Sequence, residues 1–449
     1  MGCGNGSLSN FLAQQGYEVV GVEESESGVK LANQSFPNCH FIQGSIYDLP
    51  YSELGDNFDI VIAVEVIEHL FYPKELVRSV KMSSQNTTYD PNIRPYQFLD
   101  VVKGLTIIWI CWYHIDQLMS PVRSNIAKFG YSGVSVFIIL SGFGLTFSML
   151  KNDILSSSFN NRLLTNWKNF TWKKFFFKRF FRIYPLYILA HIVFLITGFI
   201  MRKYEDMPLN IGLLLSITGL RVFFKDYFWY GPDAFWYVGL IIQFYVLFPF
   251  LFFLIKRIGN VRFLILSVVF CLISRIVTIS LPEHYTLMLG LSPNRLMEFS
   301  LGMALAYSTL MNKNMQLNSL KNKYIYSVIF SGTLIIIFLN FQTNLLLREI
   351  FIDPIIGVVA FAILTIISLL IMKIKIVSIY FVFMGNISYS FYLLHSPPIR
   401  PAFAAFMKLS IDNYYLITFL YITIITIVSF GTTWLESRLL NMLYFKNKN

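Results

Sequence analysis

The stretch "QFLDVVKGLTIIWICWYHIDQ", residues 97–117, decides the fold of most of this chain. Its length and its content of Ile, Leu, Val and Trp predict a helix that crosses a membrane. Lys103 and His114 are eleven residues apart, which on an α-helix places them on one face, roughly 16 Å apart along the axis. Asp100 precedes Lys103 by one turn. Ionisable residues are costly in a span and usually mark a functional position or an ion pair. A histidine that only makes a structural hydrogen bond is the alternative.

The composition extends this interpretation to the whole chain. Its 449 residues are 55% hydrophobic and 14% charged, whereas soluble domains carry roughly 25% charged residues. Residues 1–81 hold 4 basic and 11 acidic residues, a net charge of −7, and the remainder holds 32 basic and 14 acidic residues, a net charge of +18. We therefore expect an acidic α/β piece followed by a basic, polytopic membrane piece. The basic excess indicates cytoplasmic loops and not nucleic-acid binding.

Apolar segments of membrane length recur along the second piece and predict about ten transmembrane helices. They lie near residues 98–118, 130–150, 183–201, 236–255, 262–281, 292–311, 324–341, 351–372, 377–397 and 414–435. Residues 209–223 are apolar but short, and we interpret them as a re-entrant segment or half-span. With ten crossings every strongly basic loop falls on one side, so the positive-inside rule predicts cytoplasmic N- and C-termini. The expected location is the inner membrane of a bacterial or archaeal cell.

The start of the chain, "MGCGNGSLSNFLAQQGYEVVGVEES", predicts a loop, a helix and a strand. Gly2, Gly4 and Gly6 would let backbone amides approach a ligand at the helix start, and Glu23 would accept hydrogen bonds from a ribose. With "FDIVIAVEVIEHLFYP", residues 58–73, the segment resembles class I S-adenosylmethionine-dependent methyltransferases.

That family has a further strand before the glycine loop and several strands after the E-H segment. We therefore expect residues 1–81 to be a truncated Rossmann-like fragment, a fusion remnant that does not use S-adenosylmethionine. A bifunctional protein with a working methyltransferase is the alternative. Met82 reads as a second start, followed by a linker or cytoplasmic tail, residues 82–95.

Residues 96–437 resemble acyltransferase family 3, the integral-membrane O-acyltransferases of surface polysaccharides. The resemblance rests on the basic residue and histidine of the first span and on five further segments in order: "GYSGVSVFIILSGF", "FFFKRFFRIYPLYIL", "FWYVGLIIQFYVLFPFL", "NRLMEFSLGMALA" and "GNISYSFYLLHSPP". A basic tail, residues 438–449, would follow. The basic residue of the first span is often arginine in the family and is Lys103 here.

The resemblance implies a set of site residues. We expect His114 to act as general base, with Lys103, Glu298 and His395 as further candidates for catalysis. The residues expected to bind substrate are Arg179, Arg182, Tyr184, Gln243, Tyr245 and Arg295. The two arginines of the third span also fit the positive-inside signal alone, and Arg295 with Glu298 also fits a satisfied internal ion pair. Ser141 fits helix packing better than a nucleophile.

The implied reaction moves an acyl group, in the first place acetyl, from acyl-coenzyme A to a hydroxyl of a sugar, glycolipid or polysaccharide. A transporter or flippase of a glycan precursor is the alternative class, since it would also have many spans and buried charges. The four cysteines, Cys3, Cys39, Cys111 and Cys271, lack the spacing of a disulfide frame or a metal site. The expected partners are the lipid bilayer and a glycan acceptor.

Overall fold

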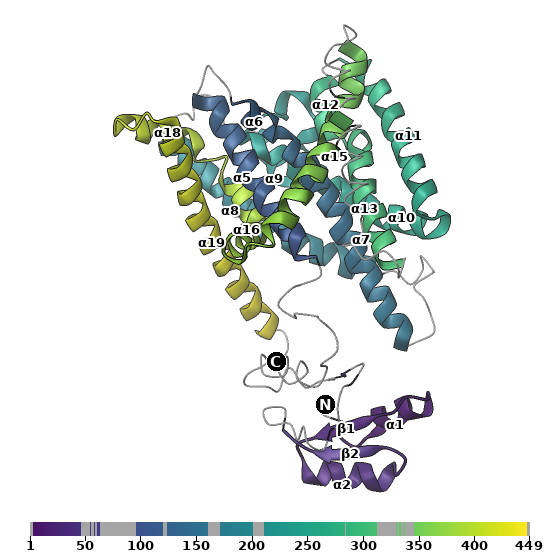
Figure 1. Ribbon diagram of the computed structural model, residues 1–449. Helices are drawn as coiled ribbons and strands as arrows, with labels where there is room; N and C mark the ends of the chain where they lie inside the picture. The colour runs from purple at the N-terminus through teal and green to yellow at the C-terminus, as the bar shows by residue number, and fades with distance from the viewer. Residues whose placement is uncertain are drawn as a thin grey trace. The chain divides into compact units, whose positions relative to one another are not determined.

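The computed structural model describes residues 3–45, 54, 58, 61–62, 96–119, 124–159, 171–200, 211–282, 284–311, 329, 332–333, 336 and 345–446. The chain divides into two units, residues 1–96 and residues 97–449, each considered by itself (Figure 1). Gly2, most of residues 58–73, the linker 82–95 and most of the predicted span 324–341 lie outside the described residues.

The first unit is a small α/β fragment, as predicted. Helix α1 (Ser7–Gln14) precedes strand β1 (Val20–Glu23), and helix α2 (Glu26–Ser35) leads to strand β2 (His40–Gln43). The two strands are parallel, with Val20 opposite His40 and Glu23 opposite Gln43, so α2 serves as the crossover that parallel strands require. Among the described residues the sheet has these two strands. A sheet of two strands buries little apolar surface, and each hydrophobic cluster beside it holds only a few side chains.

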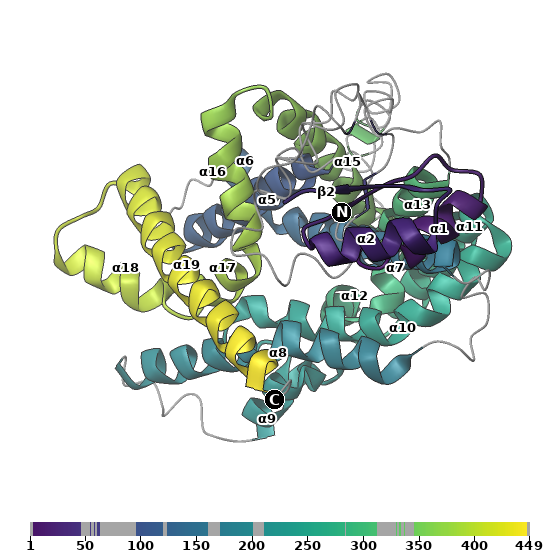
Figure 2. The same ribbon diagram turned by 90° about the horizontal axis from the view of Figure 1, so that it is seen from below.

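The second unit is a helical bundle. Its long helices are α5 (Gln97–Met119), α7 (Gly133–Phe159), α8 (Trp172–Ile200), α10 (Trp236–Ile258), α11 (Asn260–Ile279), α13 (Leu296–Met311), α15 (Leu345–Ile371) and α19 (Tyr414–Lys446). The shorter helices are α6 (Asn125–Lys128), α9 (Ile211–Thr218), α12 (His284–Gly290), α16 (Lys375–Asn386), α17 (Ser388–Leu394) and α18 (Ile399–Lys408). From below, α19 passes diagonally beside α17 and α8 (Figure 2).

Seven described helices are long and apolar enough to cross a membrane, or eight if α16 and α17, which bend by 61° at their junction, form one broken span. A multi-pass membrane protein is therefore confirmed. Two of the ten predicted spans are missing from the larger count of eight described spans. Helix α13 has 16 residues, short for a crossing, and the span 324–341 lies mostly outside the described residues. Helix α19 continues through the predicted tail as far as Lys446.

Glycines bring two pairs of long helices into direct backbone contact. A Cβ atom on Gly142 of α7 would collide with the Phe299 carbonyl of α13, and one on Gly302 would collide with the Ile139 carbonyl of α7. The same reciprocity joins α5 to α16, where Gly104 meets the carbonyl of Phe381 and Gly385 meets that of Asp100. Small residues at such crossings are typical of membrane helix packing, which depends on close van der Waals contact. These glycines lie in four of the quoted sequence segments, which thus contain packing sites.

The segment predicted to be re-entrant, residues 209–223, contains the short helix α9 and a 3₁₀ turn at Leu220–Phe223. The loop continues beyond it through 3₁₀ turns at Lys225–Tyr227 and Asp233–Phe235. Its backbone carbonyls are satisfied by one fully buried side chain, Arg221. The guanidinium donates to the carbonyls of Phe228, Tyr230 and Pro232 at 2.9, 2.6 and 3.3 Å. Non-helical backbone at membrane depth persists only where protein groups or water satisfy it, so Arg221 explains how this loop is held.

Candidate functional site

Two histidines from distant parts of the sequence meet inside the bundle. His114 lies in the last two turns of α5, and His395 follows the last residue of α17. Their ring centroids are 5.2 Å apart and the rings are tilted by 45°. His395 is fully buried and His114 is half-buried. The two histidines singled out from the sequence therefore form one site.

The backbone holds His395 in a defined orientation. Its Nδ1 lies 2.7 Å from the carbonyl oxygen of Tyr392 and 3.3 Å from that of Phe391. Its own carbonyl accepts a hydrogen bond from the Tyr421 hydroxyl of α19. The rings of Phe391 and Tyr392 lie against the imidazole, with centroids 6.3 and 5.7 Å away. His395 is therefore fixed by α17 on one side and by α19 on the other.

The break between α16 and α17 is what brings His395 to α5. After the 61° bend, α17 is fastened to its neighbours: Ser390 hydrogen-bonds the Thr433 hydroxyl at 2.6 Å, and the Tyr389 hydroxyl donates to the Ile183 carbonyl at 2.9 Å. Asn386 is exposed at the break, whereas Gly385 and Ile387 on either side are buried. An interrupted helix with a polar residue at the break is a common way to build a binding site within a membrane.

Tyrosine side chains extend from His395 into the bundle. The Tyr392 hydroxyl donates to the Ala234 carbonyl at 2.7 Å, and the Tyr237 ring lies 5.3 Å from the Tyr392 ring. The Tyr237 hydroxyl is 3.5 Å from Oγ of Ser141. Sequence reasoning missed both tyrosines, because aromatic residues in a span signal packing as readily as function.

Lys103, the other candidate residue of the first span, lies apart from the two histidines. The Lys103 ammonium is 2.8 Å from the Asp100 carboxylate, an i,i+3 pair on α5, and the neighbouring Gly104 marks the crossing with α16. The helical rise between Lys103 and His114 is roughly 16 Å. The structure thus pairs Lys103 with Asp100 and does not bring it beside the histidines.

The basic end of α8 carries two of the predicted binding residues. The Arg179 guanidinium lies over the rings of Phe175 and Tyr245, 5.4 and 5.7 Å from their centroids. Arg182 is one turn further along α8, and the Tyr184 hydroxyl is 3.4 Å from the Thr218 carbonyl. Arg179 and Tyr245, predicted from separate motifs, are therefore neighbours.

Gln243 links α10 to the segment between α12 and α13. Its amide donates to the Gly290 carbonyl at 2.8 Å and accepts from the Ser292 amide at 3.0 Å. Both ends of the side chain are used, so its position suits a structural clamp for the segment between α12 and α13.

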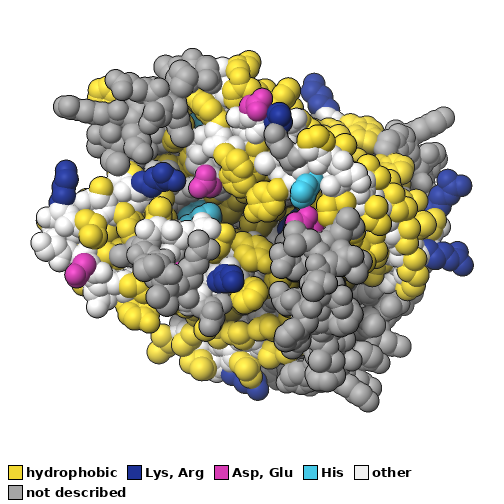
Figure 3. Space-filling model, turned by 90° about the horizontal axis from the view of Figure 1, so that it is seen from above, with side chains coloured by type: hydrophobic (Ala, Val, Ile, Leu, Met, Phe, Trp, Pro, Cys, Tyr) yellow, Lys and Arg dark blue, Asp and Glu magenta, His cyan; other side chains and the backbone are white. Residues whose placement is uncertain are grey.

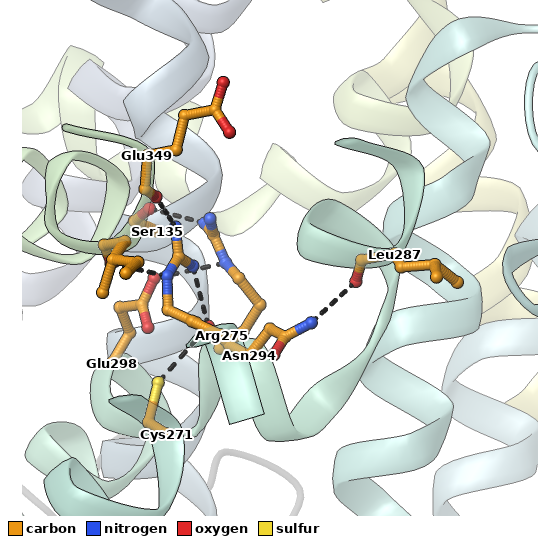
Figure 4. A network of polar contacts seen from close by, with 9 residues as sticks. Ser135, Cys271, Arg275, Leu287, Asn294, Glu298 and Glu349 are labelled. Atoms are coloured by element: carbon orange, nitrogen blue, oxygen red, sulfur yellow. Dashed lines mark hydrogen bonds and ion pairs between the residues drawn. The ribbon is translucent and has the colours of Figure 1, made fainter. Parts of the chain in front are cut away.

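Arg295 and Glu298 form an ion pair at 3.2 Å, with side chains 3% and 0% exposed. Arg295 also donates to Ser135 at 2.7 Å. Beside them a second buried arginine, Arg275, donates to the carbonyls of Asn294, Glu349 and Ile350 (Figure 4). This network ties together α7, α11, α13 and α15. Sequence reasoning missed Arg275, although an arginine within an apolar span is itself a signal.

The surface above the bundle is hollowed. Seen from the side of α6, α12 and α18, its centre is a depression with hydrophobic side chains in its depth and histidine, acidic and basic side chains around it (Figure 3). The C-terminal end of α5, which leads to α6, reaches this side (Figure 1). No group of three or more potential metal ligands occurs within the described ranges.

In the first unit the predicted ribose-binding residue is engaged by the loop. The Glu23 carboxylate accepts hydrogen bonds from the amides of Gly4, at 2.8 Å, and Ser25, at 3.3 Å. Gly6 takes a left-handed conformation, with φ of 80°, at the start of α1. Gly4 and Glu23, both expected to contact a cofactor, are thus hydrogen-bonded to each other.

Comparison with known proteins agrees with this geometry. A family model described as an acyltransferase domain matches residues 96–436, and the chain belongs to this family of membrane acyltransferases. A second model, a methyltransferase domain, matches residues 1–83. No solved structure is significantly similar to the chain.

Curated relatives resemble a small part of the chain. The ubiquinone biosynthesis O-methyltransferase of Azorhizobium caulinodans is 34% identical over 74 residues, 16% of this chain and 28% of the relative. That of Pseudomonas fluorescens Pf0-1 is 29% identical over 116 residues, 24% of this chain and 50% of the relative. The chain thus spans half or less of the length of these relatives.

Proposed function

We propose that the protein transfers an acyl group, in the first place acetyl, from acyl-coenzyme A to a sugar hydroxyl of a glycolipid or polysaccharide. The observation that carries this proposal is the meeting of His114 and His395 in a chain of the acyltransferase family. A buried pair of imidazoles suits proton transfer to and from a hydroxyl, because histidine titrates closest to physiological pH.

The reaction needs one base. His114 takes the proton of the acceptor hydroxyl as its oxygen attacks the thioester carbon. The carbon–sulfur bond then breaks and the proton passes to the departing thiolate. His114 is the less buried residue of the pair, whereas His395 is fully buried, so His114 is the better candidate for contact with substrate.

The basic N-terminal part of α8 is suited to bind the acyl donor, acyl-coenzyme A. Arg179 and Arg182, with the exposed Lys178 beside them, would hold the phosphates of coenzyme A by charge-assisted hydrogen bonds. The positive-inside rule places this end of α8 in the cytoplasm, where acyl-coenzyme A is found. The methyltransferase-like unit takes no part in the reaction.

Membranes that express the chain, supplied with radiolabelled acetyl-coenzyme A and a glycolipid acceptor, test the proposal. We expect label to enter the glycan with the wild-type chain and not with His114→Gln. Movement of glycan across the membrane without incorporation of label would instead identify the transporter class.

A further inference from the structure

One buried nitrogen of the histidine pair has no partner. Nε2 of His395 has almost no accessible surface and makes no hydrogen bond. Buried polar atoms in native structures are rarely left unsatisfied, and an exception usually has a functional reason. The surroundings of His395 define what this atom can bind.

The backbone fixes the tautomer of His395. A carbonyl oxygen can only accept, so the 2.7 Å contact with the Tyr392 carbonyl requires the proton on Nδ1. In the neutral ring Nε2 then carries a lone pair. Nε2 of His395 can therefore accept a hydrogen bond from a neighbouring donor.

The ring of His114 is in position to provide that donor. The ring centroids are 5.2 Å apart and the rings are tilted by 45°, which is close enough for a reoriented His114 ring to place a nitrogen at the N–H···N hydrogen-bond distance of about 3 Å from Nε2. A rotation of the His114 side chain would form this hydrogen bond. Phe391, Tyr392 and His114 all lie against the His395 ring, and His114 is the less buried of the two histidines.

We propose that His395 is a positioning residue: its Nε2 accepts a hydrogen bond from one ring nitrogen of His114 and so leaves the other nitrogen of His114 as the base. This inference rests on the proposed function and adds a division of roles to it. When His114 takes the hydroxyl proton, both of its nitrogens carry hydrogen and the bond to His395 persists. His395 keeps its own proton throughout.

A neutral orienting group suits this location. In soluble enzymes a carboxylate often orients the catalytic histidine, but a carboxylate surrounded by aromatic rings within a membrane protein would be expensive to ionise. An imidazole anchored on a backbone carbonyl supplies an acceptor in a fixed direction without a permanent charge.

Kinetics of three variants in lipid vesicles test the proposal. We expect His395→Ala to lower kcat by roughly 10²–10⁴-fold, to leave KM for acetyl-coenzyme A unchanged and to move the pH of half-maximal kcat. His395→Gln keeps an acceptor at the ε position and should recover about tenfold of the loss. Ser390→Ala, a buried change on the same helix, should leave the pH profile in place.

A spectroscopic measurement separates this inference from the proposed function. In protein labelled with ¹⁵N at histidine, we expect a nitrogen–nitrogen coupling across the bond between the two rings, absent in His114→Gln and in His395→Gln. If wild-type protein transfers acyl groups while His395→Ala matches it in kcat and pH profile, the inference is wrong and the proposed function stands. Absence of the coupling in folded, active wild type would overturn it as well.

Discussion

Replacing Arg295 with methionine should destabilise the bundle strongly, because it removes the cation 3.2 Å from a carboxylate that is fully buried. At an effective dielectric constant of about 20, charges at this distance attract by about 5 kcal/mol. Loss of one partner of a buried pair typically costs about 3–5 kcal/mol. We expect the unfolding equilibrium to shift by roughly 10²- to 10⁴-fold.

The chain offers a matched control. Lys103 and Asp100 form a pair with the same i,i+3 spacing at 2.8 Å, but Lys103 is 34% exposed. Lys103→Met should therefore cost less than about 1 kcal/mol. Arg295→Met combined with Glu298→Leu should regain most of the lost stability, since an apolar pair of similar volume replaces a buried ion pair without loss.

Unfolding in detergent mixtures with increasing sodium dodecyl sulfate measures these free energies. If Arg295→Met is as stable as the wild type, the pair is not a structural element and the reasoning fails. Acyl transfer by the double variant then decides the role of the pair: retained activity means that it supports the fold, and lost activity at full stability means that it takes part in the reaction.

Further changes probe the rest of the molecule. His114→Gln should lower acyl transfer by roughly 10²–10⁴-fold at normal membrane levels; transfer at the wild-type rate would make His114 structural. A chain that begins at Met82 should keep its acyl transfer, measured at equal amounts in membranes, because both histidines of the proposed site lie in the second unit. The full chain in detergent should not bind radiolabelled S-adenosylmethionine in equilibrium dialysis, and micromolar binding would contradict this. Gly302→Leu should reduce the folded yield on size-exclusion chromatography, since its side chain would meet the Ile139 carbonyl, whereas the same change at Gly144, which has open space, should not.

Hydropathy and charge predicted the class of fold because they depend on local composition. The spans of α5, α7, α10 and α19 follow directly from runs of apolar residues. The sequence also indicated that the segment around α9 is not a full crossing, since counting it as one would have put the later basic loops outside the cell. Periodicity did not predict the 61° break after Asn386, because apolar residues continue on both sides of it.

The candidate site was predictable in its members but not in its geometry. His114 stood out because an ionisable residue in a span is costly, and His395 was implied by the family resemblance. Their contact depends on how α17 turns towards α5, which no local pattern encodes. Sequence spacing alone aligned Lys103 with His114 on one face of α5, yet the lysine pairs with Asp100, because that carboxylate lies one helical turn away.

The broken span of α16 and α17 also affects how the chain inserts into the membrane during synthesis. Helix α16 has 12 residues and α17 has 7, lengths of roughly 18 and 11 Å at the helical rise, so neither half can bridge a hydrocarbon layer of about 30 Å. During synthesis these halves would enter the lipid poorly unless helices already inserted received them. Helix α5 is synthesised before the broken span and packs against α16 through Gly104 and Gly385, whereas α19, which fastens α17, is synthesised after it. The two imidazoles can therefore meet only after α17 has been made and packed against α5, so a chain interrupted before α17 lacks the histidine pair.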